Sequence, residues 1–342
     1  MAEIPGATAV SNFSNNLSQT FSSQNSQVVI FLVIGIVLAF VTAYVLYYVI
    51  SKTISNQQSY LLPDTKVPVL ATQESVFSGK KIPPSGNGYR YSINFWIYIY
   101  DIQKFNGMNR HILHRGIETD VPGVAGPYIY LDANTNKIFV TFPASNPQHT
   151  FDQTTFAGAY GTNYNSNFTN SAGTTNIPTA GKTPTDAELR FMNATRGIVL
   201  PYVPLQRWVQ VVVVVNEDAT LGGSISAYVD TELVNNVSTS TQITGLKDNN
   251  GALLNPQPQF NISDVNLDLP GNIYVGGSID SVVGPGFSGM VSMITFFNYD
   301  MNSNDVYELY KKGPVDNMLA KLGLPAYGLQ SPIYRLGDSA SK

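Results

Sequence analysis

Residues 208–215 read WVQVVVVV and form the strongest strand signal in the chain. Valine favours extended backbone because its branched Cβ restricts χ1 and packs well on a pleated surface. Successive side chains of a strand point to opposite faces, so valines at consecutive positions indicate burial on both faces. The segment therefore predicts a central strand in a sheet that is covered on both sides.

A second long strand is predicted at residues 89–100, YRYSINFWIYIY, where apolar residues alternate with mixed ones. One face carries Tyr89, Tyr91, Ile93, Phe95, Ile97 and Ile99, and the other carries Arg90, Ser92, Asn94, Trp96, Tyr98 and Tyr100. The aromatic residues of the second face suit either a stacked sugar or a buried packing layer under a helix. We favour the packing layer, which needs no ligand.

Further strands follow at intervals typical of an antiparallel sandwich. Residues 128–132 and 137–142 flank DANTN, whose Asp and Asn residues favour a turn. Residues 224–230 and 233–237 suggest a hairpin through Thr231-Glu232, and residues 272–275 and 290–298 complete the set. Glycine-marked turns and almost no helix between strands predict a mainly β, antiparallel jelly-roll sandwich.

Short helices are expected after the last strand. Asn302-Ser303 is a capping pair, and apolar residues then recur at helical spacing until Gly313-Pro314. A second such run, which contains Val315, Met318, Leu319 and Leu322, ends at Gly323.

Residues 28–50 read VVIFLVIGIVLAFVTAYVLYYVI, without a charge or a proline. A helix of this length spans about 35 Å, enough to cross a hydrocarbon core of about 30 Å. We expect a permanent anchor rather than a signal peptide, because the run is too long and no basic residue precedes it. Residues along this predicted membrane anchor include Val28, Phe31, Leu38, Val45 and Ile50.

Charge asymmetry predicts the orientation of this single-pass protein. No Lys or Arg precedes the span, whereas Lys52, Lys66, Lys80 and Lys81 follow it. The positive-inside tendency then places the large C-terminal domain on the cytoplasmic side. The expected organisation is a flexible tail at 1–27, the transmembrane helix at 28–50, a tether at 51–75, the sandwich at 76–313 with a long insertion at 143–200, and a C-terminal helix and tail at 314–342.

The insertion is rich in Asn, Thr and Gly and carries scattered aromatic residues. Long loops inside compact domains are usually functional or disordered, and aromatic residues favour at least partial order against a neighbour. The candidate partner-contact residues are Phe151, Phe156, Tyr160, Tyr164 and Phe168. Thr185-Asp-Ala-Glu188 is a capping-box pattern that predicts the start of a helix within this segment.

Four stretches together resemble the concanavalin A-like lectin/glucanase superfamily, in its laminin-G-like and pentraxin-like branch. They are YSINFWIYIYD at 91–101, RHILHRG with PYIYLDANTNKIFVTF, LQRWVQVVVVVNED with ISAYVDTELV, and NIYVGGS with GFSGMVSMITFFNYDMNSNDVYELYKKGP. The resemblance covers roughly residues 76–313 without 143–200. Thr231 stands where the family's "Y-V-D-G" strand ends in glycine.

The resemblance implies chemistry that the residues support only in part. Glucanases of the superfamily carry a Glu-x-Asp-x-x-Glu strand, because glycoside hydrolysis needs paired carboxylates, and no Glu here stands in that pattern. Relatives often bind calcium through loop carboxylates, which makes calcium a possible cofactor. The candidates are Asp132, Asp230, Asp264, Asp268 and Asp280, although single turn aspartates more often act as local caps.

Other sites are disfavoured by composition. The chain has no cysteine, which excludes zinc–thiolate and iron–sulfur sites. His111 and His114 are three residues apart, which in a regular strand places them on opposite faces, so we interpret them as structural and expect no metal site. Net charge is −4 and no basic run could neutralise several phosphates, so nucleic acid is not an expected partner.

The layout of one membrane helix before a cysteine-free, Asn/Thr-rich β-domain also resembles membrane-associated minor capsid proteins of large icosahedral DNA viruses. Only 12% of the residues are charged. The first hypothesis is therefore a non-enzymatic structural protein that links an internal virion membrane to capsid proteins. The alternative is a membrane-tethered carbohydrate-binding lectin or adhesin, which requires an extracytoplasmic sandwich. No catalytic residue is predicted.

Overall fold

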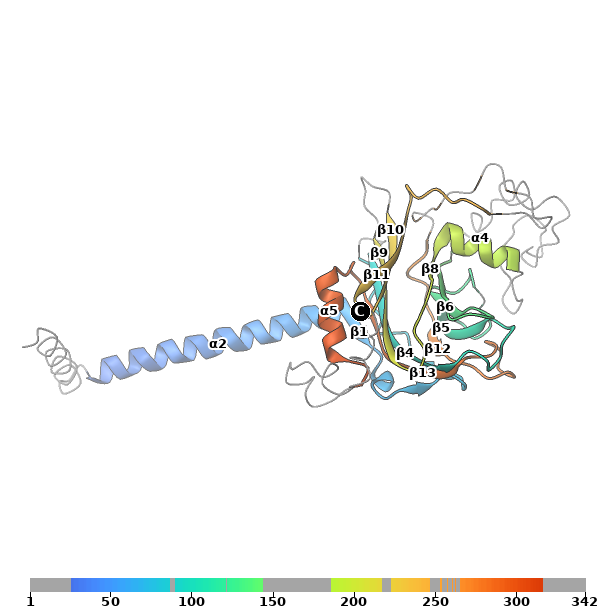
Figure 1. Cartoon of the computed structure of the whole chain (residues 1–342). Helices are drawn as coiled ribbons and strands as arrows, with labels where there is room; N and C mark the ends of the chain where they lie inside the picture. Colours follow the sequence, from blue (N-terminus) through green and yellow to red (C-terminus); the bar gives the residue numbers. More distant parts are fainter. Residues whose placement is uncertain are drawn as a thin grey trace, which may run out of the picture. The chain divides into compact units, whose positions relative to one another are not determined.

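A computed structural model describes residues 26–86, 90–120, 122–143, 186–216, 223–246, 253, 257, 260, 262 and 265–315. The chain divides into two compact units, one that ends at Gln57 and one that begins at Gln58. The described part of the first unit belongs to one long helix. The second unit is mainly β and consists of two antiparallel sheets with few helices (Figure 1).

Seven strands form the first sheet, which we call sheet A. Its order is β1 (Ser59–Leu61), β13 (Ser288–Phe297), β4 (Tyr91–Asp101), β9 (Trp208–Asn216), β10 (Ser224–Val229) and β11 (Glu232–Ser238), and β2 (Val69–Leu70) also pairs with β13. Sheet B has the order β3 (Ser75–Phe77), β12 (Asn272–Val275), β5 (Arg110–Gly116), β6 (Tyr128–Leu131), β7 (Ile138–Thr141) and β8 (Gly197–Leu200). The predicted antiparallel sandwich is confirmed.

The main core lies between the two sheets. On β4, Ile93, Phe95, Ile97 and Ile99 are fully buried in it, as the alternation of this segment predicts. The valines of β9 alternate between two buried layers: Val209, Val211, Val213 and Val215 enter the main core, and Val212 and Val214 lie on the outer face of sheet A. Burial of β9 on both faces is therefore confirmed.

The outer face of sheet A is covered by α5 (Ser303–Lys312). Val306 of α5 is fully buried against Val212, Val214, Phe297 and Met301. Trp96 is 1% exposed, and its ring stacks on Tyr310 of α5 with 5.5 Å between centroids. The packing role favoured for this aromatic face holds for Trp96, whereas Tyr100 farther along β4 is 43% exposed.

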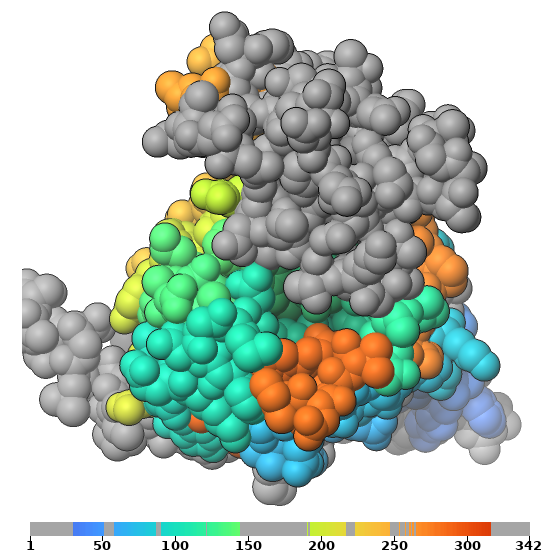
Figure 2. Space-filling view, turned by 90° about the vertical axis from the view of Figure 1, so that its right-hand side faces the viewer, coloured from blue at the N-terminus to red at the C-terminus, as the bar shows by residue number. Residues whose placement is uncertain are grey.

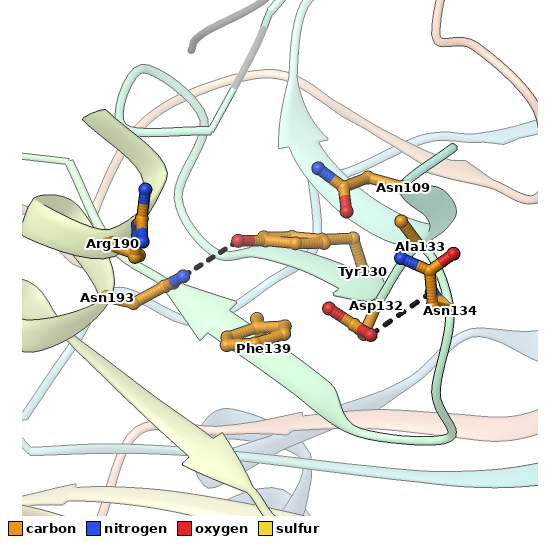
Figure 3. A pocket seen from close by; sticks show the side chains of 8 residues that line it. All are labelled: Asn109, Tyr130, Asp132, Ala133, Asn134, Phe139, Arg190 and Asn193. Carbon is orange, nitrogen blue, oxygen red and sulfur yellow. Dashed lines mark hydrogen bonds between the residues drawn. The ribbon is translucent and has the colours of Figure 1, made fainter. Parts of the chain in front are cut away.

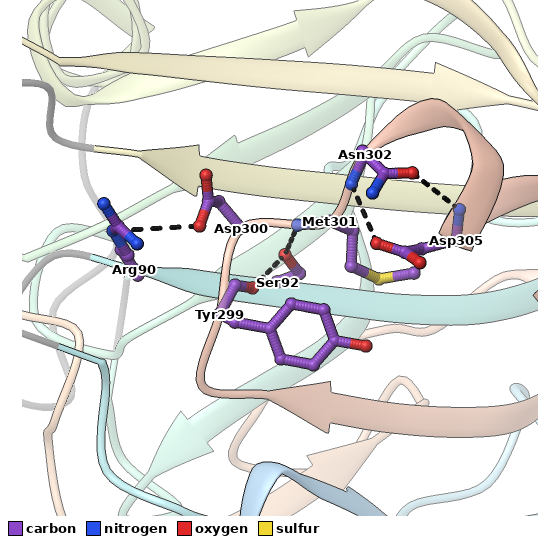
Figure 4. A network of polar contacts seen from close by, with 7 residues as sticks. All are labelled: Arg90, Ser92, Tyr299, Asp300, Met301, Asn302 and Asp305. Carbon is purple, nitrogen blue, oxygen red and sulfur yellow. Dashed lines mark hydrogen bonds and ion pairs between the residues drawn. The ribbon is translucent and has the colours of Figure 1, made fainter.

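The start of α5 is set by local polar contacts (Figure 4). Asn302 Oδ1 accepts hydrogen bonds from the backbone N–H groups of Asn304 (2.8 Å) and Asp305 (3.0 Å), and the Asp305 carboxylate accepts from the Asn302 N–H. Ser92 Oγ donates to the Tyr299 carbonyl and accepts from the Met301 N–H, which holds the preceding loop on β4. This capping box confirms the predicted helix start. The second predicted C-terminal helix lies outside the described residues from position 316 on.

The segment 51–75, which we expected to be a tether, forms regular structure along most of its length. The helix α2 (Ser26–Gln58) continues to the edge of sheet A, where β1 follows at once. The short helix η1 (Pro63–Lys66), β2 and the start of β3 then complete the segment. Strands this short are not stable by themselves. Here β1 and β2 pair with β13, and β3 pairs with β12. Leu62 (1% exposed) and Ala71 (fully buried) add apolar burial to this pairing.

The hairpin between β10 and β11 turns one residue earlier than expected. Val229 pairs with Glu232, so Asp230-Thr231 form the two-residue loop rather than Thr231-Glu232. Both loop residues have positive φ, 47° at Asp230 and 76° at Thr231. This combination is the tight turn that fits the twist of paired strands and normally favours glycine at the second position.

The predicted insertion at 143–200 is also shorter than expected. The capping-box pattern is followed by α4 (Asp186–Arg196), so the predicted helix is confirmed. Residues 197–200 form β8, the edge strand of sheet B, which pairs with β7. The candidate contact residues Phe151, Phe156, Tyr160, Tyr164 and Phe168 lie outside the described residues.

The N-terminal apolar helix is long enough to cross a membrane between Ile30 and Ile50, and this stretch has no buried residue. Phe31, Leu38, Val45 and Ile50 are each more than half exposed. Val28 lies within α2.

Candidate functional site

A pocket opens on the outer face of sheet B, between α4 and the turn that joins β6 to β7 (Figure 3). Its volume is about 290 Å³, and it is lined by Asn109, Tyr130, Asp132, Ala133, Asn134, Phe139, Arg190 and Asn193. Figure 2 views this side of the molecule, where the blue-green surface of the β5–β7 region lies beside the orange loop that follows β12.

Two aromatic rings form one wall of the pocket. Tyr130 and Phe139 are cross-strand partners in β6 and β7, and their rings stack with 5.1 Å between centroids. Asn193 of α4 donates through Nδ2 to the Tyr130 hydroxyl at 2.8 Å. Asn193 is 8% exposed, and its Oδ1 has no hydrogen-bond partner within the described part of the chain.

The opposite wall is the turn predicted from DANTN. Asp132 Oδ2 accepts hydrogen bonds from the backbone N–H groups of Asn134 (3.1 Å) and Thr135 (2.9 Å) and from Thr135 Oγ1 (2.7 Å). All three bonds reach the same oxygen, so Oδ1 carries none of them, and Figure 3 shows it directed toward the space between Tyr130 and Phe139. The prediction of a turn at these residues is confirmed.

Arg110 holds this turn from beneath. Its guanidinium donates to the carbonyls of Ile102 (2.8 Å) and Thr135 (2.9 Å) and also to the carbonyl of Asp132. Arg110 is fully buried, and burial lowers the pKa of its guanidinium, against the opposing effect of Asp132. The backbone of the turn is therefore tied to the end of β4.

His111 and His114 lie on the same face of sheet B, which corrects the expectation from regular alternation. The register between β5 and β6 shifts between His111 and Leu113, so Ile112 is the extra residue of a β-bulge. The insertion reverses the alternation and brings His111 Nε2 within 2.9 Å of His114 Nδ1. The remaining ring nitrogens face the carbonyls of Gly276 (2.7 Å) and Ile117 (3.0 Å).

Both histidines are buried, as the structural interpretation requires. The ring of His114 is stacked between Tyr128 and Tyr274 at centroid distances of 5.3 Å and 4.8 Å. Burial, with a smaller effect from His114, lowers the pKa of His111 to about 3, and burial lowers the pKa of His114 to about 4. The pair is therefore neutral at pH 7. Burial also raises the pKa of Tyr128.

The calcium candidates do not converge on one site. Asp132 acts in its own turn, Asp230 accepts from Gln210 N–H (2.9 Å) and pairs with Arg207 (2.7 Å), and Asp268 accepts from Ser85 N–H and Oγ (2.6 Å and 2.7 Å). Asp264 lies outside the described residues. Within the described ranges no three His, Asp or Glu side chains are grouped so that they could hold a metal ion.

The sequence did not indicate the pocket as such. Asp132 was a candidate for a different ligand, Tyr130 was part of a strand, and Asn193 belonged to the expected insertion. Asn193 and Tyr130 are 63 positions apart, and only the docking of α4 on β7 brings them together.

No protein-family model and no curated protein sequence matches this chain. Solved structures with a similar arrangement include the receptor binding domain of botulinum neurotoxin C/D mosaic serotype, with 12% identity and a TM-score of 0.38 over 75% of this chain and 46% of that one. The serotype D binding domain matches at 10% identity and TM-score 0.36, over 75% of this chain and 47% of that one. This chain thus spans less than half of those structures, and TM-scores below 0.5 carry no argument about function.

Proposed function

We propose that this protein is a non-enzymatic, membrane-anchored structural protein that docks to other proteins beside a bilayer. The observation that carries the proposal is the apolar stretch Ile30–Ile50, in which no residue is buried. It lies in a helix that continues, through residues 51–58 alone, into β1 of the sandwich. A helix of this composition is stable in lipid because its backbone groups are bonded internally. The lysines that follow it favour a cytoplasmic sandwich.

Within the sandwich, the pocket and the strand β1 lie near opposite ends of β4. Ser59 of β1 pairs with Phe297, which pairs with Ser92 at the start of β4. The pocket adjoins Arg110, which is bonded to Ile102 beyond the other end of β4. A strand of 11 residues is about 35 Å long. The pocket is therefore separated along β4 from Ser59, the first residue of β1.

The specific form that we propose is a minor capsid protein that links an internal virion membrane to a protein shell. A surface low in charge and rich in Asn and Thr suits dense protein contacts, which need about 1,000 Å² or more to be specific. Copurification of the full chain with a capsid-like assembly is the expected result. Isolation of the chain only with free membranes would contradict this form of the proposal.

Flotation with lipid vesicles tests the anchor. We expect the full chain to float with vesicles, and Leu38→Arg with Val41→Arg to abolish flotation, because each arginine costs roughly 3 kcal/mol at the centre of a span. The matched control places two arginines at the exposed sandwich positions Leu233 and Leu253 and should still float. Protease protection in sealed membranes reports orientation, and digestion only from the lumenal side would reject the cytoplasmic sandwich.

A membrane-tethered lectin is the second candidate, because the pocket combines aromatic rings with amide side chains, as a sugar site requires. This function needs the sandwich on the extracytoplasmic side. Calcium-dependent binding of the full chain to a glycan array would place this candidate above the first.

A further inference from the structure

The pocket at α4 and the β6–β7 turn contains two side-chain oxygens that can accept further hydrogen bonds. Asn193 Nδ2 donates a hydrogen bond to the Tyr130 hydroxyl, and the buried Asn193 Oδ1 remains available as an acceptor. Asp132 accepts three local hydrogen bonds, all through Oδ2. Its other carboxylate oxygen, Oδ1, faces the pocket. A buried acceptor without a donor costs free energy, so Asn193 Oδ1 favours a ligand that brings a donor. Asp132 is half-buried, and its Oδ1 can accept a second bond from the same ligand.

The charge and the rings of the pocket point to the same kind of ligand. Asp132 supplies a carboxylate, and the stacked rings of Tyr130 and Phe139 supply π faces that attract cations. A lysine ammonium has three donors and no acceptor, and its aliphatic stem packs against aromatic rings. A volume of about 290 Å³ is sufficient for one such side chain.

Two arginines oppose a cation, and both are placed so that the effect is limited. Arg110 directs its guanidinium to backbone carbonyls beneath the turn. Arg190 lies at the rim on α4, exposed to solvent, and Figure 3 shows its guanidinium directed away from Asp132. Solvent screens the repulsion at the rim, so Arg190 weakens binding of a cation without preventing it.

The geometry points to a receptor site for a primary ammonium group, which we assign to a lysine side chain of a docking protein. The assignment of the lysine to a protein rests on the proposed docking function. Calcium fits less well, because it prefers six to eight oxygen ligands and the pocket has a single carboxylate. A neutral sugar brings no positive charge to pair with the Asp132 carboxylate, so it gains less from this pocket than an ammonium group does.

The test compares two ligands that differ only in the ammonium group. Nα-acetyl-lysine N-methylamide and Nα-acetyl-norleucine N-methylamide are titrated into the full chain in detergent micelles, and binding is followed by saturation-transfer NMR. We expect the lysine compound to bind at least tenfold more tightly. Equal binding of the two compounds would overturn the inference.

Three variants locate the binding. Asp132→Asn keeps an oxygen for the three local bonds but removes the charge, and it should weaken lysine binding at least tenfold. Phe139→Leu should weaken it several-fold, and Arg190→Gln should strengthen it about twofold, because a like charge is removed from the rim. The control Asp280→Asn, a carboxylate in the loop after β12, should leave binding unchanged. Weaker binding in Arg190→Gln would contradict the assignment.

Further controls distinguish loss of lysine binding from misfolding, from a calcium or sugar site, and from failure of the membrane anchor. An unchanged thermal midpoint shows that Asp132→Asn is folded; if it does not fold, Phe139→Leu and Arg190→Gln carry the test. Displacement of the lysine compound by millimolar calcium or by methyl glycosides would overturn the inference in favour of a metal or a sugar. Vesicle flotation should be the same for Asp132→Asn and the unmodified chain, so failure of the anchor and failure of the pocket are distinguishable.

Discussion

The outer faces of the two sheets are both buried in part, but different chemistry buries them. Sheet A is covered by α5 mainly through apolar contacts, including the stacked pair Trp96 and Tyr310. Sheet B carries a row of aromatic rings, all but one of them polar, that crosses four strands, from Tyr274 through His114 and Tyr128 to Tyr130 and Phe139. One face is an extension of the hydrophobic core, and the other retains titratable groups and a pocket.

The two faces differ in the groups that are buried. Under α5 most contacts are apolar, and the polar side chain of Gln210 donates to Asn94 Oδ1 and to the Val306 carbonyl. On sheet B the polar groups need hydrogen-bond partners, and those of the pocket are incompletely satisfied. Stability should therefore depend on pH through sheet B and on packing volume through sheet A.

The largest loss of stability is expected where Trp96 of β4 packs under α5. Trp96→Ala removes a side chain that is 1% exposed and leaves a cavity under α5, so we expect a loss of about 3–5 kcal/mol in the free energy of unfolding. Urea denaturation measures the loss. Tyr100→Ala, at an exposed position on the same face, is the control and should cost far less. A similar loss in both variants would refute the role of α5.

Acid should weaken sheet B in particular. His111 and His114 have pKa values of about 3 and 4 in the folded protein, below about 6.5 in the unfolded chain, so unfolding takes up protons as pH falls. Between pH 6.5 and pH 5 each histidine should reduce stability by about 2 kcal/mol.

The control for this pH effect is His114→Phe, which keeps a ring between Tyr128 and Tyr274 but cannot titrate. The difference in unfolding free energy between pH 7 and pH 5 should be smaller in this variant than in the unmodified chain. Denaturation at several pH values gives this difference. Identical pH profiles would show that the pair does not govern acid stability.

The capping box at Asn302 should contribute less to the free energy of unfolding than the packing of Trp96 under α5. Asn302→Ala removes the side-chain acceptor of two backbone N–H groups and should cost about 1 kcal/mol in unfolding free energy. Asn302→Asp, which retains an acceptor at the cap, should cost little. Thermal denaturation compares the two variants, and equal destabilisation would contradict the capping role.

The smallest expected effect is a gain at the edge of sheet A. Thr231 has a φ of 76°, a conformation that is unfavourable for a β-branched residue and accessible to glycine. Thr231→Gly should therefore stabilise the protein by about 0.5–1 kcal/mol, measured by thermal denaturation. The control Thr239→Gly, beyond the end of β11, should give no gain.

The elements that the sequence predicts correctly have either a strong alternation of apolar residues or a recognisable helix cap. Alternation at 91–99 placed the core face of β4, consecutive valines identified β9 as buried on both sides, and Asn302 marked the start of α5. Each of these depends on neighbours within a few residues, so the sequence carries the information directly.

Other features escaped prediction because their cause lies elsewhere in the chain. The bulge at Ile112 adds one residue to β5, and nothing in RHILHRG announces it. β1 and β2 have three and two residues, too few for a periodic signal, and they form because β13 offers a free edge. The turn at Asp230-Thr231 was misplaced by one residue because its second position is not a glycine.

The amino-acid sequence by itself determined the apolar helix at 28–50, the antiparallel sandwich and the absence of cysteine chemistry, because composition and short-range periodicity suffice for each. Only the tertiary structure decided that His111 and His114 face each other, that α5 seals sheet A, and that α4 meets Tyr130 to form a pocket. These depend on strand register and on the docking of helices onto sheets, and both are settled by packing between segments far apart in the chain.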